Sequence, residues 1–261
     1  MQALKIAATG MAAQQMRVDV TANNIANMST TGYNARRAEF ADLHYQQIRT
    51  PGAITALSGE VLPAGIQLGL GVRASAVSME VRQGAVRRTG GELDIAIEGA
   101  GYFEITLPSG EAAFTRDGAF KLTGDGELVT SSGFPVVPAI TVPADAREVV
   151  LNADGTMFVR FDGQIDLAQI GALTLASFIN QKGLQAIGDN LFLETAASGP
   201  AQTGAPGIDG RGTFRQAYLE DSSVDVVAEI TELIEAQRGY ELNARVMAAV
   251  DEMMSAATRI R

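Results

Sequence analysis

Apolar side chains recur every seven residues near the start of the chain, at Leu4, Met11, Val18 and Ile25. This spacing predicts an N-terminal helix with a narrow apolar seam, of the kind that packs against other helices. Asparagine is a poor helix former, and it tolerates the left-handed backbone conformation at which helices end. We therefore expect the helix to stop in a cluster of three amides, Asn23, Asn24 and Asn27.

The C-terminal part of the chain predicts a second, longer helix over about 224–260. Its apolar residues form two stripes, the first made of Val226, Ile230, Leu233, Tyr240, Met247 and Met254, and the second of Leu242, Val246, Ala249, Met253 and Ile260. Residues 221–223 (Asp-Ser-Ser) are good N-cap types and Asp225 follows them, which favours a helix start at this point. Such a helix would reach about 55 Å, and its two stripes indicate more than one neighbour.

Between the two helices the apolar period changes to two, and glycine-containing turns become frequent. Residues 93–107 alternate on both sides of a break at Gly99–Gly101 and predict two strands. Three Asp-Gly pairs predict hairpin turns, at positions 117–118, 125–126 and 154–155. A further strand is expected over 172–178, and the stretch 194–212, rich in Gly, Ala, Ser and Pro, is expected to be a surface loop.

These elements predict an α+β fold. The long N- and C-terminal helices are expected to pair as a coiled-coil-like domain, discontinuous in sequence and made of residues 1–32 and 222–261. Residues 72–221 are expected to form a mainly antiparallel β middle domain. The region between them, 33–71, has mixed signals and two prolines, and we expect it to be an extended or hairpin linking segment.

Composition narrows the function. The net charge of −10 argues against nucleic acid and anionic membranes as partners. No run of about 18 apolar residues is present, so no membrane insertion is expected. The chain has no cysteine, which excludes disulfides and thiolate chemistry. Polar residues interrupt the apolar positions near the N-terminus, so a cleaved signal peptide is not expected.

No pattern of catalytic or metal-binding residues stands out. His44 is the only histidine, so neither a histidine-based metal cluster nor a conventional catalytic triad can be built. No nucleophile-elbow, P-loop or complete dinucleotide-binding motif occurs. The Asp-Gly pairs lack the alternating acidic residues of a calcium loop. We therefore expect no catalytic residues, no cofactor and no metal, and we predict that the protein is not an enzyme.

Several long motifs resemble the bacterial flagellar rod and hook proteins, and together they cover essentially the whole chain. Residues 23–27 (NNIAN) and 30–33 (TTGY) resemble the family's N-terminal signature N-N-[LI]-A-N followed by T-x-G-[FY]. GELDIAIEGAGYFEI at 91–105 resembles the element LDxAIxGxGFF, and FTRDGAF at 114–120 is similar to YTRDGxF. The run 224–260 is similar to the closing helix of the family.

Within this family, the segments 42–73 and 188–220 resemble the distal rod members, and the proximal rod paralogue is the alternative. The chain departs from the family pattern at Gln181, Ser223 and Gly239, where Pro, Asn and Ala are usual. Two other classes stay open. A monomeric binding module would use the 194–212 loop, and an export-linked enzyme would need an acid–base pair in a cleft.

The resemblance implies a structural subunit that assembles into a rigid helical tube, the drive shaft that transmits torque from motor to hook. Its expected partners are further copies of itself, proximal rod and hook proteins at the ends of the tube, the surrounding ring proteins and the flagellar export apparatus. The expected location is the periplasm-spanning rod of the basal body, reached by export without a cleaved signal peptide. The export route would suit termini that are mobile in the free subunit.

The residues expected at subunit interfaces come from both helices, the amide cluster and the linking segment. They are Leu4, Met11, Val18, Asn23, Asn24, Ile25, Asn27, Thr31, Gly32, Tyr33, Tyr45, Ile48, Leu57, Leu62, Val226, Ile230, Leu233, Gln237, Arg238, Tyr240, Asn243, Met247 and Met254. The amides are expected to fix the register of packed helices. The segment 45–65 is expected either to lie across a neighbouring subunit and lock the axial contact, or to fold onto its own middle domain as a loop.

Overall fold

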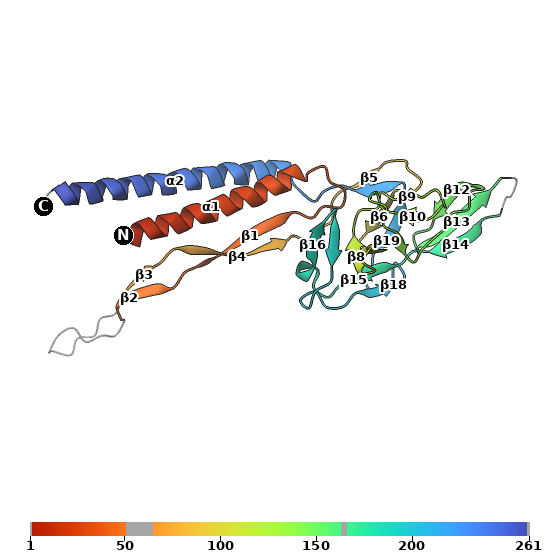
Figure 1. The fold of residues 1–261 in the computed structure, drawn as a ribbon, viewed down its shortest axis with the longest axis horizontal. Helices are drawn as coiled ribbons and strands as arrows, with labels where there is room; N and C mark the ends of the chain where they lie inside the picture. Colours follow the sequence, from red (N-terminus) through yellow and green to blue (C-terminus); the bar gives the residue numbers. More distant parts are fainter. Residues whose placement is uncertain (1, 51–64, 163–165, 260–261) are drawn as a thin grey trace. The chain divides into compact units, whose positions relative to one another are not determined.

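The computed structural model describes residues 2–50, 65–162 and 166–259 (Figure 1). The chain divides into two compact units. The helical unit contains the described residues of 1–25, 36–78 and 225–261, and the β unit contains 26–35 and 79–224. The expected division differs from this one, because residues 36–78 share their contacts with the helices and do not form a separate linking region.

The helical unit contains two helices and four strands. The helices are α1 (Gln2–Ala26) and α2 (Val226–Arg259), and the strands are β1 (Arg36–Asp42), β2 (Tyr45–Arg49), β3 (Ile66–Gly69) and β4 (Val72–Met79). Strand β1 pairs with β4, and β2 pairs with β3 in antiparallel register. The expected extended or hairpin segment therefore contains β1, β2 and β3, and its residues Leu57 and Leu62 lie outside the described residues. Neither described helix has the apolar run that would be required to cross a bilayer.

Helices α1 and α2 run antiparallel and touch along one face. Near the end of α1, the Asn24 Nδ2 donates to Glu229 Oε1 over 2.9 Å, and further back the Arg17 guanidinium lies 3.3 Å from Glu235. At the next positions, small residues bring the helices close. A Cβ on Gly239 would lie 3.0 Å from Gln14 Cδ, and a Cβ on Gly10 would lie 2.9 Å from Asn243 Oδ1. The glycine at position 239, unusual for the family, therefore gives Gln14 its space.

The register of this pair leaves part of α2 without a partner in α1. Contacts join residues 24 and 229, 17 and 235, 14 and 239, and 10 and 243. Each step back along α1 is matched by a step forward along α2, so Gln2 lies level with about residue 251 at a common rise of 1.5 Å per residue. Residues 252–259, which we call the C-terminal overhang, extend α2 by about 12 Å. All of them are exposed.

The contact face of α1 differs from the predicted seam. The contacts come from positions 10, 14, 17 and 24, which are small or polar, whereas the predicted seam residues 11, 18 and 25 each lie one position later and are only half-buried. One residue corresponds to about 100° around a helix, so the seam flanks the contact face. Strict seven-residue spacing of apolar side chains was misleading because Gly10 and Asn24 permit a closer approach than Met11 or Ile25 would.

The two predicted stripes of α2 are unequally covered. In the first stripe, Val226, Leu233 and Met247 are half-buried, whereas Ile230, Tyr240 and Met254 are exposed. The neighbouring Ala236 is buried completely. The described residues of the second stripe are exposed, with Leu242 at 61%, Val246 at 49% and Met253 at 63% of their maximal surface.

The start of α2 also differs from the expectation. Asp225 is the cap, and its Oδ1 accepts hydrogen bonds from the backbone of Val227 and Ala228 over 3.0 and 3.3 Å. The earlier Asp-Ser-Ser run is not used in this way. Ser223 instead accepts a hydrogen bond from the backbone of Ala35 over 3.0 Å.

The β unit consists of short strands joined by tight turns. Its strands are β5 (Val86–Arg88), β6 (Ile95–Glu98), β7 (Phe103–Thr106), β8 (Ala112–Thr115), β9 (Lys121–Leu122), β10 (Leu128–Val129), β11 (Val136–Val137), β12 (Ala146–Leu151), β13 (Thr156–Phe161), β14 (Ala168–Ala172), β15 (Leu175–Ser177), β16 (Gln185–Gly188), β17 (Leu191–Leu193), β18 (Gln202–Gly204), β19 (Thr213–Gln216) and β20 (Tyr218–Glu220). One 3-10 turn, η1, spans Gln181–Gly183. The largest sheet has the order β11-β7-β8-β17-β16, and a second has the order β12-β13-β14. The strands of the β unit pair in antiparallel register. The predicted α+β class with a mainly antiparallel middle domain is therefore confirmed.

Most of the predicted turns are present. The Asp-Gly pairs at 125–126 and 154–155 close the β9–β10 and β12–β13 hairpins, with glycine φ angles of 82° and 88°. The pair at 117–118 is not a hairpin turn, because β8 pairs with β7 and β17 and not with β9. The strand expected over 172–178 is divided between β14 and β15, and the loop expected over 194–212 contains β18.

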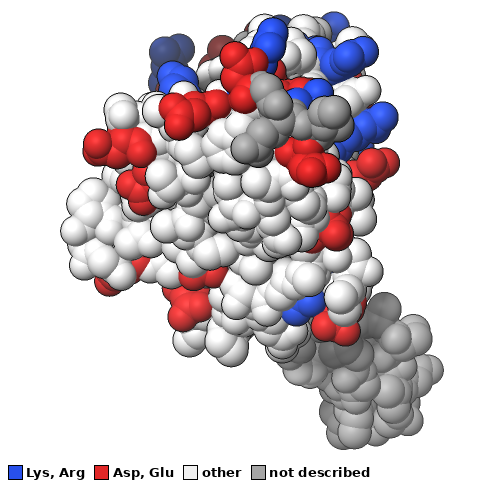
Figure 2. Space-filling model, turned by 90° about the vertical axis from the view of Figure 1, so that its right-hand side faces the viewer, with Lys and Arg blue, Asp and Glu red and all other residues white. Residues whose placement is uncertain are grey.

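Side chains at and just before β7 alternate between two apolar clusters. Phe103 and Ile105 face the larger cluster, where Phe103 stacks on Phe214 at 5.5 Å and meets Phe120 edge-on at 4.9 Å. Tyr102 faces the smaller cluster, and burial raises the pKa of its hydroxyl to about 12. Figure 2 views the β unit from the end that carries β12–β14 and shows a broad central area of uncharged side chains, bordered by acidic ones on its left.

Candidate functional site

Two chain segments lead from the β unit to the helices, and within the β unit they are hydrogen-bonded to each other. The first segment is 26–35, and the second is the end of β20 with residues 221–224. The Gly32 amide donates to the Glu220 carbonyl over 2.8 Å, and the Ser223 amide donates to the Tyr33 carbonyl over 3.0 Å. The chain therefore leaves the β unit beside the point at which it entered.

A buried ion pair lies under this junction. Arg116 and Glu220 expose 7% and 3% of their side chains, and Arg116 Nη2 lies 2.7 Å from Glu220 Oε2. The remaining hydrogen-bonding groups are also used, since Arg116 donates to the carbonyls of Gly99 and Gly101 over 3.1 Å each. The Gly84 amide donates to the other carboxylate oxygen of Glu220 over 3.0 Å. Such complete pairing is what makes a buried charge pair tolerable.

Three sequence motifs meet at this ion pair, which sequence reasoning did not single out. Arg116 belongs to FTRDGAF, Gly99 and Gly101 belong to the LDIAIEGAGYF element, and Gly32 belongs to TTGY. The sequence signal that could have indicated the ion pair was Arg116, a charged residue that follows the apolar positions of a predicted strand. The predicted residue Gly32 is central, because its φ is 65° and a Cβ there would lie 2.9 Å from the Arg116 carbonyl carbon. The neighbouring Thr31 carbonyl accepts a hydrogen bond from Asn190 Nδ2 over 3.1 Å.

Replacing Gly32 with alanine should destabilise the β unit by about 2–4 kcal/mol, because strain at a left-handed φ adds to a clash with Arg116. Gly110→Ala is the matched control. Gly110 has a φ of 85° with open space around its Cβ position, so that variant should show only the backbone cost of about 1 kcal/mol. Chemical denaturation of both variants measures the difference. Equal losses of stability would show that contact with Arg116 contributes nothing.

In the helical unit, Asn24 links three elements. It is 1% exposed, and its Nδ2 donates to the Arg36 carbonyl over 2.8 Å and to Glu229 Oε1 over 2.9 Å. Its Oδ1 accepts a hydrogen bond from the Arg36 amide over 2.9 Å. The side chain thus joins the end of α1 to the start of β1 and to the first turns of α2. Helix α1 ends at Ala26, within the predicted amide cluster, and Asn24 is hydrogen-bonded within its own chain.

The other predicted interface residues lie in varied surroundings. Asn23 is exposed, and Asn27 Oδ1 accepts a hydrogen bond from the Thr30 hydroxyl over 3.1 Å. Asn243 Nδ2 donates to the Gly239 carbonyl over 2.9 Å. The remaining exposed members are Tyr45, Ile48, Ile230, Gln237, Arg238, Tyr240 and Met254. Gln237 and Tyr240 line one pocket with the predicted residue Val18, and the other exposed members lie elsewhere on the helical unit.

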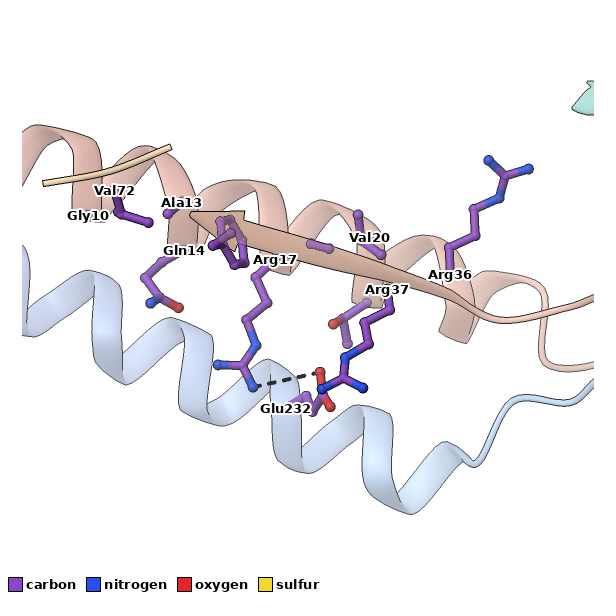
Figure 3. Close-up of a pocket in the computed structure, with 12 residues that line it drawn as sticks. Gly10, Ala13, Gln14, Arg17, Val20, Arg36, Arg37, Val72 and Glu232 are labelled. Carbon is purple, nitrogen blue, oxygen red and sulfur yellow. Dashed lines mark ion pairs between the residues drawn. The ribbon is translucent and has the colours of Figure 1, made fainter. Parts of the chain in front are cut away.

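One polar cavity of about 320 Å³ lies in the helical unit between α1, β1 and α2 (Figure 3). Its cationic lining residues are Arg17, Arg36 and Arg37, and Glu232 is its acidic one. The Arg17 guanidinium lies 3.7 Å from Glu232, and in Figure 3 Arg37 also extends toward α2 while Arg36 extends away. Among the described residues, no group of three or more His, Cys, Asp or Glu side chains could hold a metal ion.

Comparison with known proteins agrees with this architecture. Residues 4–34 match the model "Flagella basal body rod protein", 96–159 match "Flagellar hook protein FlgE/F/G D1 domain", and 215–260 match "Flagellar basal body rod FlgEFG protein C-terminal". The chain is 49% identical to the flagellar basal-body rod protein FlgG of Caulobacter vibrioides over 100% of both chains. It is 46% identical to FlgG of Agrobacterium fabrum over 99% of both, and 41% identical to FlgG of Borreliella burgdorferi over 100% of this chain and 99% of the relative.

Helices α1 and α2 belong to one unit, and the β unit lies between them in the sequence. Together with the family matches, this organisation identifies the chain as a flagellar axial protein, which is a class of structural subunits. Within that class, the chain belongs to the family of the flagellar basal-body rod protein FlgG, the subunit of the distal rod. The predicted resemblance to flagellar rod and hook proteins, and to their distal rod members, is confirmed.

Proposed function

We propose that copies of this chain assemble through their helical units into the rigid tube of the distal rod, which transmits torque. The observation that carries the proposal is the unpaired apolar surface of α2, including Ile234 at 44%, Leu242 at 61% and Val246 at 49% exposure. A long helix with such a stripe beside its intramolecular contact is suited to a second helix–helix interface. In the assembled tube, α1 and α2 would then pack in a coiled-coil-like manner with neighbouring copies.

The same proposal includes the predicted interface residues, the predicted partner proteins and the predicted export route. The apolar residues flanking the α1 contact face would meet neighbouring subunits. Proximal rod and hook proteins would bind at the two ends, and ring proteins would surround the tube. The chain would reach the basal body through the flagellar export apparatus without a cleaved signal peptide. The negative net charge fits a protein partner rather than nucleic acid.

Concentration-dependent polymerisation of the purified chain tests this function. Sedimentation should show monomers in dilute solution and polymers above a critical concentration, and electron microscopy should show straight tubes. Leu242→Ser with Val246→Ser should raise the critical concentration, because two exposed apolar side chains are lost. Val227→Ser is the control for position along the helix, because Val227 is 76% exposed but lies near the start of α2. A monomer at every concentration would contradict the proposal.

We propose that the segment 45–65 makes the assembled tube stiff. Of its described part, Tyr45 and Ile48 are exposed at 57% and 59%, and the paired strand β3 adds Ile66 at 50%. These side chains favour a contact across a neighbouring subunit over a fold onto the chain's own surface.

Deleting Tyr45–Gly65 should leave a folded subunit whose polymers bend more easily, because the axial contact is lost. The persistence length of the polymers in electron micrographs measures this change. Tyr45→Ser combined with Ile48→Ser, which retains the segment, should give an intermediate value. Polymers of the deletion variant as straight as those of the parent would contradict this role.

A further inference from the structure

Ile179, in the β unit, is an apolar side chain that its own chain leaves uncovered. It is 80% exposed, and no large apolar side chain among the described residues is more exposed. The residues on either side of it are fixed. Phe178 is 7% exposed and meets Tyr102 edge-on at 5.9 Å, and Asn180 Nδ2 donates to the Ala197 carbonyl over 3.0 Å. Packed neighbours therefore hold Ile179 in its exposed position.

The turn η1, which follows Ile179, is also packed and carries a cation. The Thr195 hydroxyl donates to the Gly183 carbonyl over 2.6 Å, and a Cβ on Gly183 would lie 2.6 Å from the carbonyl carbon of Ala197. Lys182 lies in this turn and is exposed. The chain thus presents one apolar and one cationic side chain, three residues apart, on a fixed turn.

A groove on the same unit has apolar walls. Its volume is about 330 Å³, whereas an apolar cavity of about 150 Å³ already holds a benzene molecule, so the groove can admit a branched aliphatic side chain. The apolar side chains that line it are Leu93, Leu122, Val142 and Val149. Leu122 is 39% exposed, so part of this apolar surface is open to solvent.

The charges that line the groove are anionic in sum. Glu92 and Asp125 contribute two carboxylates, and both residues are exposed. Arg147 is the cation in the lining, but its guanidinium lies 3.2 Å from Asp162, which compensates its charge. An occupant of this groove is therefore favoured if it combines an apolar side chain with a cation.

The groove and Ile179 lie on different sides of the β unit. In Figure 1, strand β15, which ends two residues before Ile179, is near the lower edge of the unit, whereas β9 and β12, which contribute to the groove, are near its upper edge. A contact between two different surfaces of identical chains is heterologous, and it repeats into an open helical filament when the rotation does not close. A tube built from one kind of subunit needs such a contact.

We propose that Ile179 of one copy of this chain inserts into the groove of the next copy, with Lys182 beside Glu92 and Asp125. The proposal rests on the proposed self-assembly and adds a contact between β units to the contact between helical units. The charges give the contact its orientation. Because the turn that carries Ile179 is already fixed, little conformational freedom is lost on binding.

Ile179→Ser should raise the critical concentration for polymerisation about tenfold, because the groove loses its apolar occupant. Ile208→Ser is the matched control. Ile208 is also an exposed isoleucine of the β unit, at 56%, and its substitution should change the critical concentration less than twofold. Circular dichroism of the dilute monomers checks that both variants are folded. Polymers of Ile179→Ser that form at the parent's critical concentration would overturn this contact and leave the proposed function standing. A parent chain that forms no polymers would overturn both.

The absence of cysteine from the chain permits a direct test of proximity. Two single-cysteine variants, Gly124→Cys at the groove and Lys182→Cys beside Ile179, are mixed, polymerised and oxidised. A Cβ on Gly124 meets open space, so the substitution fits. One variant carries an affinity tag, so a mixed dimer differs in mass from dimers of either variant alone.

We expect mixed dimers on a denaturing gel, formed only above the critical concentration, because a disulfide needs Cα atoms within about 7 Å of each other. Ser109→Cys, in the β7–β8 turn, replaces Lys182→Cys as the control and should form at least tenfold fewer. Polymers in which Lys182→Cys cross-links no more than Ser109→Cys would overturn the proposal.

Charge exchange tests the orientation. Lys182→Glu and Glu92→Lys should each raise the critical concentration about threefold, because each places like charges opposite one another across the contact. The two changes in one chain should restore most of the loss, since opposite charges meet again. A combined variant no better than the worse of the two single variants would overturn the assigned orientation.

Discussion

Replacing Glu220 with alanine should destabilise the β unit by about 3–5 kcal/mol, the largest single effect that we expect in this protein. The substitution leaves Arg116 charged, buried and without its anion, and it also removes the acceptor of the Gly84 amide. Because Glu220 directly precedes the segment that leads to α2, the loss should also disturb the connection to the helical unit. Chemical denaturation followed by circular dichroism measures the change in the free energy of unfolding.

Two further variants separate charge burial from simple loss of a contact. Glu98→Ala removes one partner of an exposed ion pair with Arg215, 3.9 Å apart, and should cost less than about 1 kcal/mol. Arg116→Met with Glu220→Met removes both buried charges and should be more stable than Glu220→Ala, because no uncompensated charge remains. If Glu220→Ala costs no more than Glu98→Ala, the buried pair does not organise the β unit.

Asn24→Ala should weaken the helical unit by about 2–4 kcal/mol. Three hydrogen bonds are lost, two with the Arg36 backbone and one with Glu229. The Arg36 amide and carbonyl are then left without their partner, at about 1–3 kcal/mol for each buried group. The better helix propensity of alanine returns only about 0.5 kcal/mol. Hydrogen exchange of the Arg36 amide reports the local loss, and the critical concentration for polymerisation should rise.

Asn23→Ala is the matched control for Asn24→Ala. Asn23 is the preceding residue of the same helix and is exposed, so this substitution should leave the Arg36 amide protected. It gains the same helix propensity, so protection of the Arg36 amide in the two variants separates the contacts of Asn24 from the change in propensity. The double variant Asn24→Ala with Asn27→Ala should impair polymerisation as well, although it is intrinsically more helical. Unchanged assembly of the double variant would show that the amides only terminate α1.

The long helices and the alternating strands could be predicted because period and turn chemistry are local properties of the sequence. The α1 seam could not, because helix contact here depends on where glycine and a small polar side chain let backbones approach, as at Gly10 and Asn24. The Asp225 cap was displaced from the expected Asp-Ser-Ser run because Ser223 bonds to Ala35, a partner 188 residues away in sequence. Local sequence propensity does not reveal hydrogen-bond partners that are so distant in sequence.

The ion pair of Arg116 and Glu220 shows the same limit for the candidate site. Each residue is ordinary in its own segment, and only the tertiary fold brings together residues separated by 104 positions. The family motifs indicated that Gly32, Gly99 and Gly101 matter without giving the reason. The structure supplies it, because these glycines place backbone groups against one guanidinium or beside it.

The bond between Asn24 and Glu229 spans 205 positions and has a consequence for the order of folding. Closing a loop of that length costs entropy that is recovered only once the β unit between the two ends has become compact. The β unit is therefore the first part to fold, and the helix pair is completed last. Helix α2 follows the β unit in the sequence, so a chain cut before Val226 lacks α2 and the bond between Asn24 and Glu229. We expect such a truncated chain to retain the β unit without a completed helix pair.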